Sequence, residues 1–252
     1  MEAIVYICHG SRVKESKEES FALIDRVKKL VDVPIQETCF LELQQPSIEE
    51  AVGHVIHKGA TKIVFLPILL LTAGHAKIDI PEIIYQQQNK YPSIAFHYGR
   101  PIEVEPKMID AVTDHIHQLT QDYEQYDFLF VGRGSSDMQA LEDTNTIISL
   151  LQKKFPNNTI EACFLAASKP KFEELLVEKV TKQKKSVLIV PYLLFTGLLI
   201  KGMRKYMESI SLEPNQKIIM SEYLGHHENV VQVLADRVEE ARGERSRLAK
   251  VD

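Results

Sequence analysis

The chain of 252 residues contains no tryptophan and only three cysteines, Cys8, Cys39 and Cys163. Three scattered cysteines are too few for a disulfide framework, and none forms the CxxC pair typical of zinc ribbons and many iron–sulfur proteins. Glycine and proline, at 11 residues each, are too rare for a fibrous or low-complexity chain. These absences leave an ordinary globular protein, for which no iron–sulfur cluster is expected.

A basic excess and a long hydrophobic run are also missing. The sequence has 30 Lys+Arg against 35 Asp+Glu, a net charge of -5, so a nucleic-acid partner is not expected. The longest apolar run, Ile63–Leu71, is far shorter than the roughly 20 residues that span a bilayer. The first residues also lack the basic and apolar regions of a signal peptide. The sequence therefore predicts a cytoplasmic protein with no membrane partner.

Common cofactor motifs are absent as well. There is no GxxxxGK[ST] loop, so ATP is not expected to take part. Gly10-Ser11-Arg12 and Gly132-Arg133-Gly134 each follow an apolar run, but neither matches GxGxxG, so NAD is not expected either.

The sequence repeats itself. At an offset of 124 residues and without a gap, positions 4–80 align on 128–204 with 18 identities in 77 positions. The identities fall in blocks, which include Gly10-Ser11 on Gly134-Ser135, Cys39-Phe40-Leu41 on Cys163-Phe164-Leu165, and Pro67, Leu69, Leu70, Thr72 and Lys77 on Pro191, Leu193, Leu194, Thr196 and Lys201. A period this long indicates two fused domains rather than a solenoid. We divide them as 1–124 and 125–252.

Both halves alternate short apolar runs with amphipathic stretches, which predicts an α/β fold with a four-stranded parallel sheet and helices on both faces in each half. The strand order expected for such a doubly wound sheet is 2-1-3-4. A helix is expected to begin near Ile80-Pro81, and the charged run Ala241–Asp252 is expected to fray. The predicted strands are Ile4–Cys8, Ile35–Leu41, Ile63–Leu69 and Ile94–Tyr98, then 128–131, 159–165, 186–190 and 217–220.

The residues that follow the strands differ between the two copies. Ligands of parallel α/β sheets bind beyond the carboxyl ends of the strands. At these positions the first copy has His9, Glu42 and His75, where the second has Arg133, Ala166 and Leu199. Two imidazoles and a carboxylate suit a divalent metal such as Fe, Co, Ni or Zn, and they also suit proton abstraction near neutral pH. We therefore predict His9, Glu42 and His75 as both metal-binding and catalytic residues.

Charge is also divided unevenly, with a net -6 in residues 1–124 and +1 in residues 125–252. Basic residues follow several strand ends, and as a set they suit a polyanionic ligand held between a metal-handling half and a carboxylate-binding half. The candidates for carboxylate binding are Arg133, Arg12, Lys77 and Arg100, with Lys201, Arg204 and Lys205 nearby in the second half. His97, in the fourth predicted strand, is a further candidate for substrate contact, whereas the other histidines, among them His115 and His227, are expected at the surface.

Three segments carry a family resemblance: ICHGSR at 7–12, FLELQQPSIEEA at 40–51 and PILLLTAGHAKIDIP at 67–81. Together they resemble sirohydrochlorin chelatases of the CbiX/SirB type, in the long bacterial form whose second, degenerate half replaces a dimer partner. The similarity is greatest to the ferrochelatases of siroheme synthesis. The resemblance implies a chelatase-like fold and ATP-independent insertion of Fe²⁺ into sirohydrochlorin, with release of two protons. The metal- and proton-handling residues of the family would be His9, Glu42 and His75.

The resemblance leaves three alternatives open. Imidazole and carboxylate ligands also accept Co²⁺ and Ni²⁺, so a cobaltochelatase of anaerobic cobalamin synthesis has the same ligand set. A non-catalytic carrier of tetrapyrrole or metal would have the same sequence features. An unrelated α/β enzyme acting on small anions is the third. The fused halves are expected to act as a monomer whose partner is the tetrapyrrole.

Overall fold

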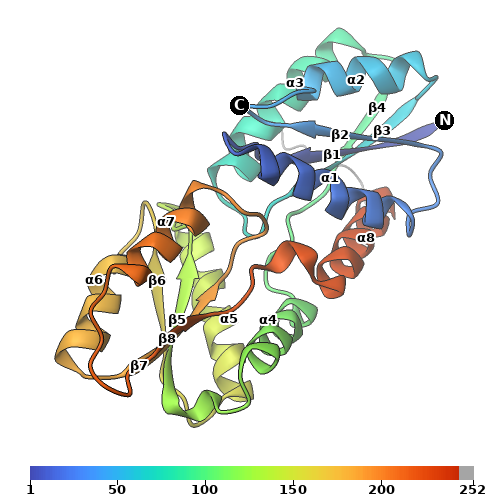
Figure 1. Cartoon of the computed structure of the whole chain (residues 1–252). Helices are drawn as coiled ribbons and strands as arrows, with labels where there is room; N and C mark the ends of the chain where they lie inside the picture. The colour runs from blue at the N-terminus through green and yellow to red at the C-terminus, as the bar shows by residue number, and fades with distance from the viewer. Residues whose placement is uncertain (244–252) are drawn as a thin grey trace. The chain divides into compact units, whose positions relative to one another are not determined.

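A computed structural model describes residues 1–243 of the chain, which form two compact units. The first unit combines residues 1–103 with the described residues from Val230 onward, and the second contains residues 104–229. Each unit has one four-stranded parallel sheet (Figure 1). The predicted fold class is confirmed.

The sheet of the first unit has the strand order β2-β1-β3-β4, as predicted. Its central strands are uninterrupted apolar runs, as expected for parallel strands buried on both faces. Its elements are β1 (Glu2–Cys8), α1 (Lys14–Lys28), β2 (Ile35–Phe40), α2 (Ile48–His57), β3 (Lys62–Ile68), the π-helical turn η1 (His75–Asp79), α3 (Ile80–Lys90), β4 (Ala95–Tyr98) and α8 (Glu228–Gly243).

Helices cover both faces of this sheet. Alternate side chains of β1, such as Val5 and Ile7, pack with buried residues of α2 and α3. Helices α1 and α8 cover the opposite face (Figure 1). A Cβ on Gly99, just after β4, would lie 2.9 Å from the Cβ of Ala241, so α8 is in close contact with the end of that strand.

The second unit repeats this architecture with the order β6-β5-β7-β8, with α6 and α7 on one face and α4 and α5 on the other (Figure 1). Its elements are α4 (Pro106–Leu119), η2 (Tyr123–Gln125), β5 (Tyr126–Gly132), α5 (Met138–Lys154), β6 (Ile160–Phe164), α6 (Phe172–Val177), η3 (Glu178–Lys182), β7 (Ser186–Pro191), α7 (Leu198–Glu208), β8 (Ile218–Met220) and η4 (Leu224–His226).

The compact units differ from the two sequence halves in their last helices. Helix α4 ends the first half but belongs to the second unit, and α8, from Val230 on, ends the second half but belongs to the first unit. Within the first unit Arg237 of α8 is 2% exposed and donates hydrogen bonds to the carbonyl oxygens of Pro101 and Ile102, at 3.1 and 2.7 Å. The predicted division at residue 124 is therefore not the boundary of the compact units.

Two further predictions concern the ends of helices. The helix expected near Ile80-Pro81 is confirmed, since α3 begins at Ile80 with Pro81 in its first turn, and the π-helical turn His75–Asp79 directly precedes it. Of the run Ala241–Asp252, the first residues complete α8 and the others lie outside the described residues. None of the helices within residues 1–243 is both long and apolar enough to span a bilayer.

A buried ion-pair cluster lies at the amino-terminal edge of the second sheet. Lys179 of η3 is 3% exposed and donates to the carboxylate of Asp127 at 3.0 Å, and it also pairs with Glu161. Burial lowers the pKa of Lys179, but the hydrogen bonds to the two carboxylates outweigh this and leave the pKa raised. Removing the ammonium would leave a buried carboxylate without its cation.

We predict that Lys179→Met lowers the free energy of unfolding by about 3–5 kcal/mol, since breaking a buried ion pair from one side leaves an uncompensated charge. The measurement is chemical denaturation at neutral pH. Lys182→Met removes the same charge from an exposed position of the same turn and is expected to stay within about 0.5 kcal/mol of the wild type. Equal stability of the two variants would contradict the prediction.

Candidate functional site

The ladder between β1 and β2 extends past both strands and brings His9 beside Glu42. The amide of Leu41 donates to the carbonyl of Cys8 at 2.8 Å, and the amide of Glu42 donates to the carbonyl of His9 at 3.1 Å. Gly10 permits this approach: its φ is +99°, and a Cβ there would lie 1.9 Å from the carbonyl oxygen of Glu42. A glycine is therefore required directly after His9.

His75 reaches the same edge from the loop after β3. It opens the π-helical turn η1, in which the amide of Ile80 donates to the carbonyl of His75. The hydroxyl of Tyr98, at the end of β4, donates to the carbonyl of Ala76 at 3.0 Å and ties this turn to the sheet. Single π-helical turns are rare and are found frequently at functional sites.

The two predicted histidines face each other. Their Nε2 atoms lie 3.1 Å apart, and the rings meet edge to face with centroids separated by 4.7 Å. Two nitrogen ligands of one tetrahedral ion, each about 2.0–2.1 Å from it, are about 3.3 Å apart. The pair is thus spaced for one shared ion or one shared proton. The side chains of His9 and His75 are 26% and 35% exposed, so solvent and solutes reach them.

The far nitrogens of both rings face oxygen atoms. Nδ1 of His75 lies 2.6 Å from Oδ2 of Asp79. Nδ1 of His9 lies 3.1 Å from the carbonyl oxygen of Gly10 and 3.6 Å from Oε1 of Glu42. Since a carbonyl oxygen and an ionised carboxylate only accept hydrogen bonds, we assign the ring protons to Nδ1 in both histidines. The two Nε2 atoms then face one another at a distance at which they can share one proton or one ion.

Glu42 takes a different place from the one predicted. It lies on the Nδ1 side of His9 and does not join the two Nε2 atoms. Within residues 1–243, no three His, Cys, Asp or Glu side chains are arranged to hold a metal ion. The expected ligand set of two imidazoles and Glu42 is therefore not assembled here. The two imidazoles do face each other, and Glu42 lies on the far side of the His9 ring.

Asp79 is the site residue that the sequence analysis missed. It was part of the motif that ends in Asp79-Ile80-Pro81, but no role was assigned to it. Its spacing of four residues from His75 is a usable signal, because residues i and i+4 lie on one face of a helical segment.

The predicted carboxylate-binding residues fall into two groups. Arg12, Lys77 and Arg133 are exposed and follow strand ends, as expected. Arg100 instead donates to Glu240 at 3.0 and 3.1 Å and to Glu103 at 2.9 Å. These two carboxylates raise the pKa of Arg100 and hold its guanidinium within the first unit. Arg100 thus already binds two carboxylates of its own unit, and its contact with substrate carboxylates stays a prediction.

The second unit keeps the backbone of the site without its chemistry. The amide of Leu165 donates to Gly132 and that of Ala166 donates to Arg133, in the same pattern as around His9 and Glu42. Gly134 has φ +91°, close to that of Gly10. Leu199, at the place of His75, is 37% exposed. The scaffold is thus shared between the copies, whereas the imidazoles and the acid belong to the first unit alone.

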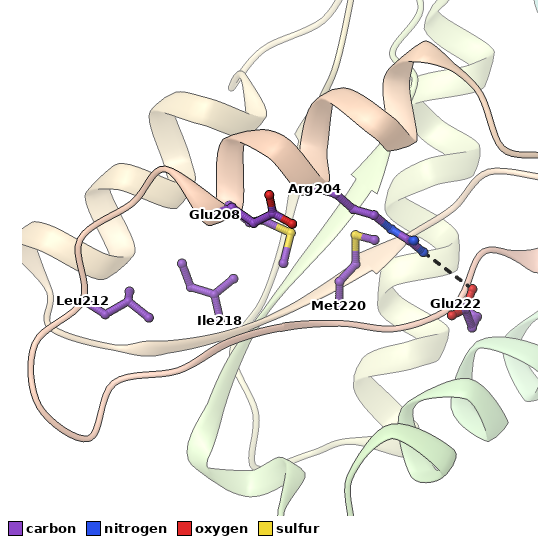
Figure 2. A pocket seen from close by; sticks show the side chains of 7 residues that line it. Arg204, Glu208, Leu212, Ile218, Met220 and Glu222 are labelled. Atoms are coloured by element: carbon purple, nitrogen blue, oxygen red, sulfur yellow. Dashed lines mark ion pairs between the residues drawn. The ribbon is translucent and has the colours of Figure 1, made fainter. Parts of the chain in front are cut away.

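A pocket of about 440 Å³ lies along the edge strand of the second unit, between α7 and β8 (Figure 2). The pairing of β8 with β7 matches that of β4 with β3, so Ile218 and Met220 take the places of Phe96 and Tyr98. The pocket is lined by Arg204, Met207, Glu208, Leu212, Ile218, Met220 and Glu222. It therefore opens where the second copy lacks two aromatic side chains.

Two histidines expected at the surface are largely buried in the second unit. His115 is 8% exposed, and its Nδ1 lies 3.1 Å from the carbonyl oxygen of Glu222. Its ring meets that of His227, whose Nε2 lies 3.3 Å from Asp114. Burial, and then the neighbouring His227, lower the pKa of His115. The helical spacing did not reveal this contact, because His227 comes from a distant loop.

The chain is similar to proteins of known activity. A sirohydrochlorin ferrochelatase of Priestia megaterium is 42% identical over 239 residues, covering 94% of this chain and 90% of the relative. A sirohydrochlorin cobaltochelatase of the same organism is 33% identical, covering 95% and 80%. The solved structure of SirB from Bacillus subtilis with Fe³⁺ superposes with a TM-score of 0.85 at 37% identity, covering 96% of both chains.

The family model described as CbiX matches the chain twice, over residues 3–119 and 127–241. The two matches correspond to the two copies of the internal repeat, and together they cover nearly all the residues that the structure describes. The chain belongs to the CbiX family.

Proposed function

We propose that the chain is a sirohydrochlorin ferrochelatase, which inserts Fe²⁺ into sirohydrochlorin without ATP and releases two protons. The observation that carries the proposal is the pair of facing imidazoles at the carboxyl edge of the first sheet, where His9 Nε2 and His75 Nε2 lie 3.1 Å apart. The relatives of the chain include a sirohydrochlorin ferrochelatase. Fe²⁺ is a substrate in this reaction, and the imidazole pair is where we propose that it first binds.

The same pair suits the proton side of the reaction. Metal insertion requires that two pyrrole N–H groups lose their protons, while the Fe²⁺ ion leaves its protein ligands for the ring nitrogens. Each Nε2 atom that releases the metal has its lone pair available to accept a proton. We propose that His9 and His75 accept these protons and that Glu42, 3.6 Å from His9 Nδ1, passes one on to solvent.

We propose exposed basic residues as the contacts for the substrate. Sirohydrochlorin is a polycarboxylate, and guanidinium groups bind carboxylates with two parallel hydrogen bonds. Arg133, in the second unit, and Arg12 and Lys77, in the first, are exposed and follow strand ends. Arg133 occupies the place of the catalytic His9 in its own copy, and a cation there favours substrate carboxylates over a metal ion.

We predict that His9→Ala and His75→Ala each lower the rate of Fe²⁺ insertion by about 10²–10⁴-fold, as expected when a positioned base is removed. The rate is followed anaerobically by the absorption change of sirohydrochlorin, with a no-protein reaction as the baseline. His54→Ala is the matched control, since His54 is an exposed histidine of α2 in the same unit. Full activity in both site variants would exclude the imidazole pair from the reaction.

For substrate binding, we predict that Arg133→Ala raises the KM for sirohydrochlorin about 10-fold and leaves kcat close to the wild-type value. Loss of an interaction made equally in the ground and transition states acts on KM, and a hydrogen bond to a charged group contributes about 1.5–3 kcal/mol. Initial rates over a range of sirohydrochlorin concentrations measure both constants. Lys153→Ala, at an exposed position in the last turn of α5, is the control; an unchanged KM for Arg133→Ala would remove this residue from the binding site.

Cobalt insertion is the second candidate, because a cobaltochelatase is among the relatives and is 33% identical over most of the chain. Imidazole ligands accept both ions. Comparing kcat/KM for Fe²⁺ and Co²⁺ in one assay decides between them. A carrier would instead bind sirohydrochlorin or metal and give no rate above the no-protein baseline.

A further inference from the structure

The carboxylate of Asp79 sits directly behind His75. Its Oδ2 atom lies 2.6 Å from Nδ1 of the imidazole, which is the length of a strong, charge-assisted hydrogen bond. The two residues are the first and the last of the π-helical turn η1. Neither the predicted ligand set nor the proposed reaction uses Asp79.

The second copy of the repeat serves as an internal comparison. At the same places α7 has Leu199 and Met203 instead of His75 and Asp79, and it is an ordinary α-helix from Leu198 to Glu208. The tyrosine that ties the first turn to its sheet is replaced there by Met220. The pocket of Figure 2 opens beside that replacement. The copy without the imidazole thus also lacks the carboxylate, the π-helical turn and the tyrosine.

The differences between the two copies show which of these features the fold itself needs. A second sheet with the same strand order and the same extended β5–β6 ladder forms with an ordinary α-helix at the place of this turn; the π-helical turn of the second unit, η3, lies elsewhere, after α6. The turn is therefore not needed to build this fold. The π-helical turn, Asp79 and Tyr98 are all found in the copy that has His75.

We propose that Asp79 is a positioning residue, which holds the proton of His75 on Nδ1 and thereby keeps the Nε2 lone pair directed at His9 and at the incoming metal ion. This inference rests on the proposed function for its catalytic consequence, but its effect on metal binding does not. A carboxylate hydrogen-bonded to the far nitrogen fixes both the tautomer and the ring orientation of a metal-binding histidine and raises its strength as a ligand. The tie from Tyr98 to Ala76 holds the turn that carries both residues.

The test is Asp79→Asn, which keeps the size of the side chain and removes its charge. We expect the affinity for Co²⁺ alone, titrated by its visible absorption, to fall about 10–100-fold, the range for loss of such an outer carboxylate. The kcat for insertion is expected to fall similarly, while the KM for sirohydrochlorin stays unchanged. Asp79→Glu, which restores a carboxylate, is expected to recover part of both losses.

A spectroscopic measurement separates positioning from folding. In the metal-free protein, long-range ¹H–¹⁵N correlation of the His75 ring is expected to place the proton on Nδ1, and Asp79→Asn is expected to populate the Nε2–H form. Asp25→Asn, which removes an exposed carboxylate of α1, is the matched control for charge. Wild-type Co²⁺ affinity and an unchanged tautomer in Asp79→Asn would overturn the proposal. Failure of the wild type to insert any metal would refute the proposed function and leave the affinity and tautomer results valid.

Discussion

The site depends on one electrostatic constraint: the Nε2 atoms of two imidazoles lie 3.1 Å apart. Such an arrangement is repulsive unless a proton or a metal ion lies between the two atoms, or one ring changes tautomer. Asp79 and the carbonyl of Gly10 oppose the change of tautomer, because each faces an Nδ1 atom and accepts a proton from it. The space between the two Nε2 atoms therefore favours a cation, either a proton or a metal ion. This preference is the physical basis of the proposed exchange of Fe²⁺ for protons.

The duplicated fold shows which features serve the scaffold and which serve the site. Both copies extend the ladder of their first two strands by the same two hydrogen bonds and place a glycine with positive φ at the same point. These features bring the residues after the strands together, whatever those residues are. Arg133 and Ala166 occupy the places of His9 and Glu42, so the same backbone carries a basic surface in one unit and an imidazole pair in the other. The two copies thus differ in these side chains, and an ordinary α-helix in the second copy stands where the first has the π-helical turn His75–Asp79.

The sequence was sufficient to predict the sheet order and the meeting of His9 with His75, because apolar runs define parallel strands and ligand-binding residues follow their carboxyl ends. It did not predict the side of His9 on which Glu42 lies, since that depends on a rotamer rather than on the position of the backbone. The exchange of α4 and α8 between the units was also missed, because amphipathicity shows that a helix packs on a sheet but not which sheet. The ion pair of Arg100 was missed for the same reason: its partner Glu240 lies on α8, 140 residues further along the chain.

The two carboxylates beside the imidazole pair have a consequence for the proposed reaction as a whole. Glu42 and Asp79 together contribute two negative charges within ion-pair distance of the two rings. A bound Fe²⁺ ion neutralises both of them. When the ion passes to the macrocycle and the two imidazoles take up the two pyrrole protons, the same two positive charges return to the same place. In the proposed reaction the net charge of the site is then equal before and after transfer.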